Sequence, residues 1–283
     1  KYKFHVRLNL YLIKTHDILK ENIMNKIEII NSEGELKSFP IDQSIFLKST
    51  NKKWSVLYMT RLAIAGATGL VGRKMLETVD RKGIAFDELV LFSSARSAGE
   101  QIEFQGKTYT VRELTDEAAS EPFDYVLMSA GGSTSEHYSP IFEQAGAIVI
   151  DNSSQWRMTE GIDLIVPEVN EPKLDRKIIA NPNCSTIQSV VPLKPLQETF
   201  GLKRVAYTTY QAVSGSGVKG KQDLAEGANG KAPEAYPHPI YNNVLPHIDT
   251  FLEDGYTKEE QKMIDETKKI LNDQNLKVTA TCV

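Results

Sequence analysis

From residue 61 onward, short apolar runs alternate with longer segments that carry apolar residues on one side only. The longer segments predict helices at 70–82 and 134–146, because their apolar positions recur at the spacing of one helical face. The short runs are apolar at consecutive positions, which is typical of strands buried on both faces of a parallel sheet. These predicted strands lie at 61–65, 88–94, 124–130, 147–153 and 178–182. We therefore expect an α/β domain whose parallel sheet is covered by helices on both sides.

The pattern changes after the last of these strands. A helical segment runs from Cys184 toward Phe200, and we expect Pro192 and Pro195 to kink or break it. The alternation at 203–213 is typical of a strand in an antiparallel sheet. The remaining predicted elements are a strongly amphipathic helix at 258–274, a strand at 276–283 and a long surface loop at 227–239. A second, α+β domain is therefore expected to begin near Cys184.

The first 58 residues have a different character. They are rich in Lys, Asn and Ile, poor in Gly and Ala, and show no clean period over any long window. The chain opens at Lys1, and Met59 stands directly before the first convincing strand, which favours Met59 as the natural start. The alternative is a short α/β appendage. We expect three parts, at 1–58, 59–183 and 184–283.

Composition narrows the class of protein. The 283 residues carry a formal net charge of −4, and no run of Lys or Arg could track a phosphate backbone, so nucleic acid is not expected as a partner. No apolar run approaches the ~20 residues that span a bilayer, so we expect no membrane association and a cytoplasmic location. The two cysteines, Cys184 and Cys282, fit a reducing compartment better than a disulfide scaffold, and without a CxxC motif a metal site is not expected.

A glycine-rich turn joins the first predicted strand to the first helix. The stretch GATGLVG contains Gly66, Gly69 and Gly72. Glycines there permit positive φ and allow the backbone to approach a pyrophosphate, whose charge is met by N–H groups at the helix N-terminus. The spacing is GxxGxxG and not the commoner GxGxxG, so the motif gains its weight from its place between strand and helix. It favours a Rossmann-type dinucleotide-binding domain over a plain tight turn.

The residues at the end of the second predicted strand indicate which dinucleotide the domain binds. A cofactor with a free ribose 2′-hydroxyl is usually met by an acid about 20 residues after the glycines. The stretch FSSARSAG has no acid there and offers Ser94, Arg96 and Ser97. Arginine and hydroxyl donors suit a 2′-phosphate, so NADP(H) is favoured over NAD(H). The alternative is that Arg96 is an ordinary solvated loop residue.

Cys184 lies in the stretch NPNCST, at what should be the first turn of a helix. The helix dipole and free N–H groups at that position favour a thiolate, as a nucleophile requires, whereas a lone cysteine is more often a small buried hydrophobe. Next to a nicotinamide cofactor, a thiolate can turn an aldehyde into a thiohemiacetal and then a thioester by loss of hydride. The combination predicts cysteine-dependent aldehyde dehydrogenase chemistry.

Several motifs together resemble the bacterial aspartate-semialdehyde dehydrogenases. In chain order they are GATGLVG, SARSAG, SAGGSTS, DNSSQWRM, VPEVN, NPNCST, YQAVSGSG and EEQKMIDETKKI. The resemblance covers almost everything from Met59 to Val283 and leaves out residues 1–58. It implies a glyceraldehyde-3-phosphate-dehydrogenase-like fold, with an NADP-binding domain at 59–183 and a catalytic and dimerisation domain at 184–283. It also implies a homodimer.

The resemblance further implies a reaction and its residues. L-aspartyl 4-phosphate and NADPH would give L-aspartate 4-semialdehyde, phosphate and NADP, a step toward lysine through diaminopimelate, threonine, methionine and isoleucine. Cys184 would form the thioester and Gln211 would hold the substrate, while Arg157 and Lys262 would contact phosphate and Glu259 the substrate ammonium. The implied cofactor-binding residues are Gly66, Thr68, Gly69, Leu70, Val71, Gly72, Ser94, Arg96, Ser97, Ser214 and Gly215. Arg157 could otherwise be a surface charge, and Glu259 with Lys262 a helical i,i+3 pair.

The chain departs from the family pattern in one respect. In the family, the strand ending ATCV continues into an arginine that grips the substrate carboxylate and then a histidine that acts as general acid/base, whereas this sequence stops at Val283. None of His5, His16, His137, His238 and His247 has that context. Feeble catalysis is therefore expected. The rival interpretations are an N-acetyl-glutamyl-phosphate-reductase-like enzyme and a catalytically impaired nucleotide-binding fragment.

Overall fold

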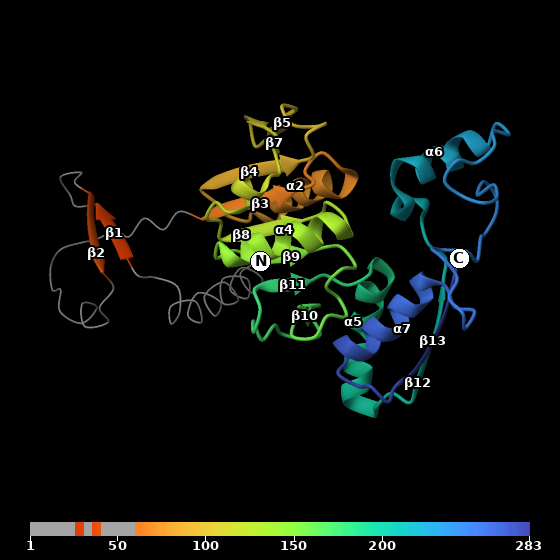
Figure 1. The fold of residues 1–283 in the computed structure, drawn as a ribbon. Coiled ribbons are helices and arrows are strands. Elements are labelled where there is room, and N and C mark those ends of the chain that lie inside the picture. Colours follow the sequence, from red (N-terminus) through yellow and green to blue (C-terminus); the bar gives the residue numbers. More distant parts are fainter. Residues whose placement is uncertain (1–25, 31–35, 41–59) are drawn as a thin grey trace. The chain divides into compact units, whose positions relative to one another are not determined.

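The computed structural model describes residues 26–30, 36–40 and 60–283, and the chain divides into two compact units, Lys1–Thr60 and Arg61–Val283 (Figure 1). In the first unit, strands β1 (Lys26–Ile30) and β2 (Leu36–Pro40) pair antiparallel. The interpretation of Met59 as the natural start lies outside the described residues. None of the helices in the described part of the chain is long and apolar enough to cross a membrane.

The second unit contains the predicted parallel sheet. Its seven strands run in the order β10-β11-β9-β8-β3-β4-β7, and every neighbouring pair is parallel. The bounds are β3 Arg61–Ala65, β4 Glu88–Ser93, β7 Arg112–Glu113, β8 Tyr125–Met128, β9 Ile148–Asp151, β10 Asp163–Leu164 and β11 Ile178–Ala180. The five predicted strands are confirmed within one to two residues at their ends, while the two-residue strands β7 and β10 are too short to produce a periodic signal.

Both faces of this sheet are covered, as the unbroken apolar runs predict. Leu62 and Ile64 of β3 pack with Leu76 of helix α2 (Leu70–Lys82) in one cluster. Ala63 and Ala65 belong to the cluster on the other face, which includes Phe142 of α4 (Gly132–Gln144). Alternate side chains of one strand thus reach opposite layers, which is why the strand shows no polar side. The short helix α3 (Asp116–Ala119) adds Ala118 and Ala119 to the second cluster.

A small hairpin, which the sequence pattern did not reveal, covers the edge of the α2 layer. Strands β5 (Gln101–Phe104) and β6 (Lys107–Thr110) pair antiparallel around Gln105 and Gly106, whose φ values are 48° and 72°. Two positive φ values in a two-residue loop are typical of a type I′ hairpin, which normally carries Asn-Gly or Asp-Gly. Gln-Gly at this position hides the turn from sequence inspection.

Helix α5 runs unbroken from Cys184 to Phe200, so of the predicted kink or break at Pro192 and Pro195 the break does not occur. A helical proline leaves the carbonyl four residues earlier without an amide partner. Those carbonyls belong to Gln188 and Val191, and these residues and both prolines are exposed, so that water can satisfy the carbonyls. The helix therefore tolerates prolines that a buried helix would not.

Strands β12 (Arg204–Thr209) and β13 (Lys277–Cys282) pair parallel, which corrects the antiparallel prediction. Alternation determines which side of a strand is buried, but the connection determines its direction. Here a long crossover separates the strands. It contains the 3-10 helix η2 (Val213–Ser216), helix α6 (Gly217–Gly227) and helix α7 (Lys258–Ile270). The predicted helix at 258–274 is thus confirmed with an earlier end, whereas α6 was missed because three glycines lower its helical propensity.

Candidate active site

The glycine turn after β3 is built so tightly that two of its glycines cannot be replaced without a clash. Gly66 has a φ of 83°, and a Cβ there would lie 2.3 Å from the carbonyl oxygen of Ser129. A Cβ on Gly72 would lie 2.2 Å from the carbonyl oxygen of Gly66. Gly69 has an ordinary φ of −72° and is the N-cap of α2, with no side chain in front of the helix. The turn thus places bare backbone at a helix N-terminus, as anion binding requires.

A cleft of about 500 Å³ opens at this turn. It lies where the chain leaves β3 and β8, neighbouring strands whose connections run to opposite sides of the sheet, and ligands bind at such switch points. Its lining residues are Gly66, Thr68, Gly69, Ser93, Ser94, Ala95, Glu113, Leu114, Ser129, Ala130, Thr134 and Tyr138. Four predicted cofactor residues, Gly66, Thr68, Gly69 and Ser94, therefore meet at one cleft.

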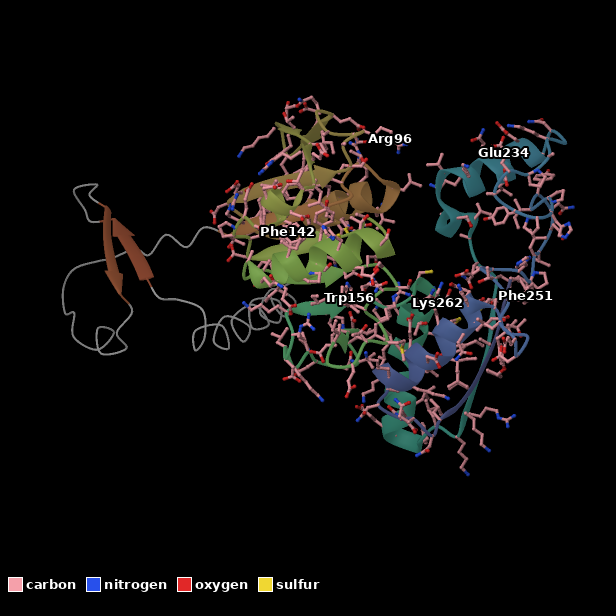
Figure 2. All side chains as sticks on the ribbon, in the orientation of Figure 1. Arg96, Phe142, Trp156, Glu234, Phe251 and Lys262 are labelled. Carbon is pink, nitrogen blue, oxygen red and sulfur yellow. The ribbon has the colours of Figure 1, made fainter. Side chains whose placement is uncertain are left out.

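The other predicted cofactor residues lie outside this lining. Leu70 and Val71 occupy the first turn of α2, where they are 44% and 46% exposed. Arg96 and Ser97 lie on the turn after β4, where the N–H of Ser97 donates to the carbonyl of Ser94, and Arg96 is exposed (Figure 2). Gly72 serves the packing of α2. Their contact with a cofactor remains a prediction.

Ser214 and Gly215 also stand apart from the cleft lining. Both belong to η2, in the second part of the chain, and the N–H of Gly215 donates to the carbonyl of Ala212 at 3.3 Å. The structure therefore places them in one short turn that follows Gln211. Their place beside the nicotinamide stays a prediction.

The predicted helix at 134–146 is confirmed as α4, but sequence inspection missed that its N-terminus lies at the cleft. Helix α4 is preceded by Gly131, whose φ is 90°, and Thr134 in its first turn lines the cleft. The signal was present in SAGGSTS, where glycines again follow a strand and precede a helix. Tyr138, one turn further along, lines the cleft and donates its hydroxyl to the carbonyl of Leu114 at 3.0 Å. Two helix N-termini thus lie at this cleft, and the dipole at a helix N-terminus favours negative charge.

Cys184 is the first residue of α5 and is exposed, which confirms the prediction of a cysteine in the first turn of a helix. Asn183 caps the helix, because its side-chain oxygen accepts from the N–H groups of Ser185 and Thr186 at 2.8 and 3.3 Å. Cys282, and not Cys184, is the small buried hydrophobic cysteine. It is 0% exposed, and its sulfur lies 3.5 Å from the sulfur of Met263. Cys184 is therefore open to a substrate.

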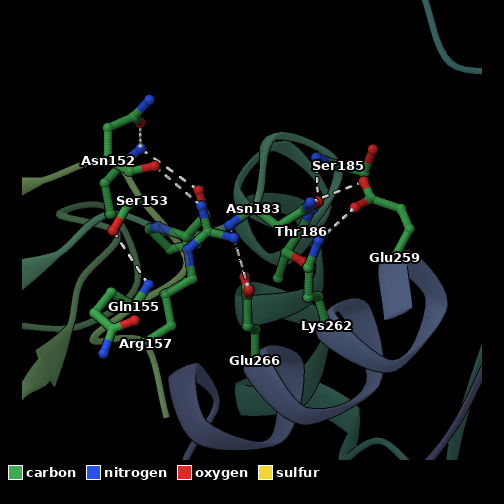
Figure 3. A network of polar contacts seen from close by, with 12 residues as sticks. Asn152, Ser153, Gln155, Arg157, Asn183, Ser185, Thr186, Glu259, Lys262 and Glu266 are labelled. Atoms are coloured by element: carbon green, nitrogen blue, oxygen red, sulfur yellow. Dashed lines mark hydrogen bonds and ion pairs between the residues drawn. The ribbon is translucent and has the colours of Figure 1, made fainter. Parts of the chain in front are cut away.

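Glu259 is brought beside this turn by helix α7. Its Oε1 accepts from Asn183 Nδ2 at 2.8 Å (Figure 3). The same oxygen accepts from Gln211 Nε2 at 3.1 Å. Gln211 is itself oriented by the hydroxyl of Thr209, which donates to its Oε1 at 2.9 Å. Three predicted site residues, Cys184, Gln211 and Glu259, therefore lie around a single polar network although their segments are far apart in the sequence.

Lys262 lies one turn along α7 from Glu259. Its Nζ is 3.4 Å from Glu259 Oε2 and 2.9 Å from Asp249 Oδ2, so the predicted i,i+3 pair does form. Burial alone would lower the pKa of Lys262, but the hydrogen bond to Asp249 and the charge of Glu259 outweigh it, and its pKa is raised. The ammonium thus remains protonated at neutral pH, as an anion-binding group must.

Arg157 is buried, at 8% exposure, which excludes its interpretation as an ordinary surface charge. Its Nη1 is 3.0 Å from Glu266 Oε1, and its Nη2 donates to the carbonyl of Asn152 at 3.2 Å. Glu266 was not among the predicted site residues. Burial raises the pKa of Glu266, against the opposing effects of Arg157 and of the N–H of Asn183. The sequence pattern did not single out Glu266, because this residue lies on the side of α7 where apolar residues are expected.

Family models match two consecutive parts of the chain. Residues 61–177 match the semialdehyde dehydrogenase NAD binding domain, and residues 193–283 match the semialdehyde dehydrogenase dimerisation domain. Aspartate-semialdehyde dehydrogenase of Aquifex aeolicus is 53% identical over 234 residues, which cover 79% of this chain and 69% of the relative. The enzyme of Bacillus subtilis is 45% identical over 237 residues, covering 78% of this chain and 68% of the relative.

Solved structures agree with these sequence matches. The aspartate semialdehyde dehydrogenase II of Vibrio cholerae, complexed with ASA, is 44% identical with a TM-score of 0.75, over 80% of this chain and 70% of that one. The Candida albicans aspartate semialdehyde dehydrogenase, solved with NADP, is 26% identical with a TM-score of 0.58, over 80% of this chain and 67% of that one. The two family models together match most of the chain, and relatives about half identical to it span more than three quarters of its length, so the chain belongs to the aspartate-semialdehyde dehydrogenase family.

Proposed function

We propose that this chain carries out the family reaction, the NADPH-dependent reductive dephosphorylation of L-aspartyl 4-phosphate to L-aspartate 4-semialdehyde, with Cys184 as nucleophile. The observation that carries the proposal is the exposed thiol at the start of α5, one residue from an asparagine that binds Glu259. A thiol there can attack an acyl group, and the neighbouring carboxylate and cations suit a substrate that bears both an ammonium and a phosphate.

The cleft fits a dinucleotide. Gly66 and Gly69 line the cleft without side chains, so a pyrophosphate can approach the backbone at the N-terminus of α2. Thr68, Gly69 and Thr134 would hold the phosphates at the N-termini of α2 and α4, and Ser94 with Arg96 would meet a 2′-phosphate. When bound, NADPH supplies the hydride that reduces the acyl group to the aldehyde level. The name of the Candida albicans structure, which includes NADP, supports this choice of cofactor.

The chain's own residues would act as follows. The Cys184 sulfur bonds to the acyl carbon while the carbon–oxygen bond to phosphate breaks, and phosphate leaves with the bonding electrons. Gln211, oriented by Thr209 and Glu259, would hold the acyl group beside the sulfur. Arg157 and Lys262 would bind the phosphate. After reduction, the carbon–sulfur bond breaks, the aldehyde leaves and the thiolate is restored.

Glu259 supports an aspartyl substrate over an N-acetyl-glutamyl one. The residue is 7% exposed, its Oε1 accepts hydrogen bonds from Asn183 and Gln211, and its Oε2 lies 3.4 Å from Lys262 Nζ, so a substrate ammonium would be its second cationic partner. An α-ammonium would pair with it, whereas an acetylated nitrogen carries no charge to compensate. The relatives reported above bear the aspartate-semialdehyde name, in agreement with this choice.

A homodimer is proposed for the second part of the chain. The match to a dimerisation domain at 193–283 supports it, as do large exposed hydrophobic side chains in that region, including Tyr210 at 78%, Val218 at 65% and Phe251 at 56%. Sedimentation equilibrium tests this state, and a monomer mass at micromolar concentration would contradict it. The proposed location is the cytoplasm, in keeping with a biosynthetic enzyme family.

The test of the reaction is the phosphate-dependent reduction of NADP by L-aspartate 4-semialdehyde, followed at 340 nm. The expected result is turnover that requires phosphate and is lost in Cys184→Ser but kept in Cys282→Ser. N-acetyl-glutamate 5-semialdehyde, run at the same concentration, should be a poor substrate. Preference for the acetylated aldehyde, or phosphate-dependent turnover that survives in Cys184→Ser, would contradict the proposal.

A further inference from the structure

Glu266 joins the two elements that carry the proposed nucleophile and the proposed phosphate ligand. Its Oε1 accepts from Arg157 Nη1 at 3.0 Å, and its Oε2 accepts from the backbone N–H of Asn183 at 2.6 Å (Figure 3). Asn183 is the N-cap of α5 and directly precedes Cys184. One carboxylate therefore holds a guanidinium with one oxygen and the entry to the cysteine helix with the other.

Glu266 is buried, so water could not replace a hydrogen-bonding partner that it lost. Its side chain is 1% exposed and that of Arg157 is 10% exposed. A buried charge left without its counter-ion is strongly unfavourable, so each member of the pair requires the other. A glutamine could not replace the carboxylate, because it has one acceptor oxygen, while two donors, the guanidinium and the Asn183 N–H, converge on this position.

A second group on the same helix face supports the segment that bears Arg157. Lys269, one turn after Glu266, donates its Nζ to the carbonyls of Arg157, Thr159 and Ile162 at 2.7, 3.2 and 2.9 Å. The backbone of residues 157–162 is thus fixed to α7 independently of the guanidinium. With that backbone fixed, the contribution of Glu266 is specifically to the direction of the Arg157 side chain and to the turn before Cys184.

We infer that Glu266 is a positioning residue that sets the guanidinium of Arg157 and the turn carrying Cys184 relative to each other. The inference rests on the proposed function, in which phosphate leaves the acyl group at Cys184 and is bound by Arg157. Both groups must hold one geometry for the leaving phosphate to be bound where it forms, and displacement by about 1 Å is costly in such sites. Glu266 touches neither substrate nor cofactor in this scheme.

The test measures how well inorganic phosphate protects Cys184 from iodoacetamide in the full chain, with labelling located by peptide mass. The variants are Glu266→Gln and Glu266→Asp, and Asp265→Asn is the matched control because it removes a neighbouring carboxylate of α7 that pairs only locally with Gln261. We expect the half-protecting phosphate concentration to rise about tenfold in both Glu266 variants, as the loss of one charge-assisted contact implies, and to stay unchanged in the control. Glu266→Asp keeps a negative charge beside Arg157 and changes only the reach of the carboxylate. If this variant is folded and phosphate protects Cys184 less well, the effect of Glu266 is on position and not on stability.

Arg157→Met distinguishes failure of the inference from failure of the proposed function. If phosphate does not protect wild-type Cys184, or protects it equally in Arg157→Met, the phosphate role of Arg157 is wrong and the inference is overturned with it. If Arg157→Met weakens protection while both Glu266 variants behave as wild type, only the inference is overturned. Loss of the folded state in both Glu266 variants, read by circular dichroism, would also overturn it and assign Glu266 a purely structural role.

Discussion

The side chains of Asn183 and Glu259 are joined by a hydrogen bond of 2.8 Å although 76 residues separate them in the chain. The first caps the helix that begins with Cys184, and the second lies in the first turn of α7, within a capping box formed by Thr257 and Glu260. Each helix start is therefore fixed locally by its own cap before the two are joined. A thiol and a carboxylate at defined helix starts give the site a geometry that loops alone would not provide.

Selective labelling should distinguish the two cysteines. In the native protein, iodoacetamide is expected to modify Cys184, which is exposed, and to leave Cys282 unmodified, because Cys282 is fully buried. Peptide mass mapping after a short reaction at neutral pH measures this, and labelling in denaturant is the control in which both react. Equal labelling of both cysteines without denaturant would contradict the burial of Cys282.

Alanine substitutions in the glycine turn should have unequal effects. Gly66→Ala combines a positive φ with a Cβ 2.3 Å from a backbone oxygen, and such strain and overpacking should lower the free energy of unfolding by about 2–4 kcal/mol. Gly69→Ala is the matched control, since its Cβ would lie 3.4 Å from the nearest atom at an ordinary φ. Urea denaturation of both variants measures the difference, and equal stabilities would show that the turn is looser than described.

Arg96 should discriminate between the two nicotinamide cofactors. If its guanidinium binds a 2′-phosphate, Arg96→Ala is expected to weaken NADPH binding about tenfold and to leave NADH binding unchanged. Fluorescence titration with each cofactor measures both constants. Arg81→Ala, which removes an exposed arginine from the last turn of α2, is the control. If Arg96→Ala weakened NADH binding as much as NADPH binding, Arg96 would be an ordinary solvated loop residue.

Glu143 should make stability depend on pH. Burial alone would raise its pKa, but the hydrogen bond from Arg176 and then the N–H of Lys177 lower it below the ordinary value of 4.5. A depressed carboxyl pKa contributes stability above the unfolded value, and this contribution is lost as the pH falls through the folded value.

Glu143→Gln should therefore cost about 1 kcal/mol at pH 7, after allowance for partial solvent screening, and less at pH 3. Urea titrations at both pH values measure the change. Glu136→Gln, an exposed substitution on the same helix, is the control and should show little difference between the two pH values. A cost for Glu143→Gln that stays constant from pH 7 to pH 3 would contradict the described ion pair.

Asp223 should hold the segment that follows α6. Its carboxylate accepts from the backbone N–H groups of Glu234, Ala235 and Tyr236, and these bonds lower its pKa, with the Glu234 N–H as the largest cause. Asp223→Asn is expected to accelerate hydrogen exchange at these three amides, because one amide oxygen cannot serve all of them. Lys221→Gln, an exposed substitution on the same helix, is the control. Unchanged exchange rates in Asp223→Asn would show that the segment is held by other contacts.

Much of the nucleotide-binding part could be predicted from sequence because its signals are local. Apolar runs such as 61–65 and 88–94 have no polar side to face water, and glycine at 72 is required by the carbonyl of Gly66 within the same turn. The helix start at Cys184 is also local, since Asn183 caps it within the same stretch.

Other features depended on partners distant in sequence. The parallel pairing of β12 with β13 follows from the crossover between them, and the continuous helix through Pro192 and Pro195 follows from the exposure of that side of α5. Alternation does not record the direction in which a strand pairs, and proline content does not record whether that side of a helix is exposed. Both predictions failed because they depended on the tertiary surroundings.

The sequence by itself indicated the glycine turn, the strands of a parallel sheet and a cysteine at a helix start, because each leaves a signal in a short stretch of residues: glycines between strand and helix, unbroken apolar runs, and a capping asparagine. Only the tertiary structure decided that Glu266, on the apolar face of an amphipathic helix, would be buried against Arg157 and the amide of Asn183. A buried carboxylate is stable only where distant donors converge on it, and no periodicity along a single helix records where those donors will be.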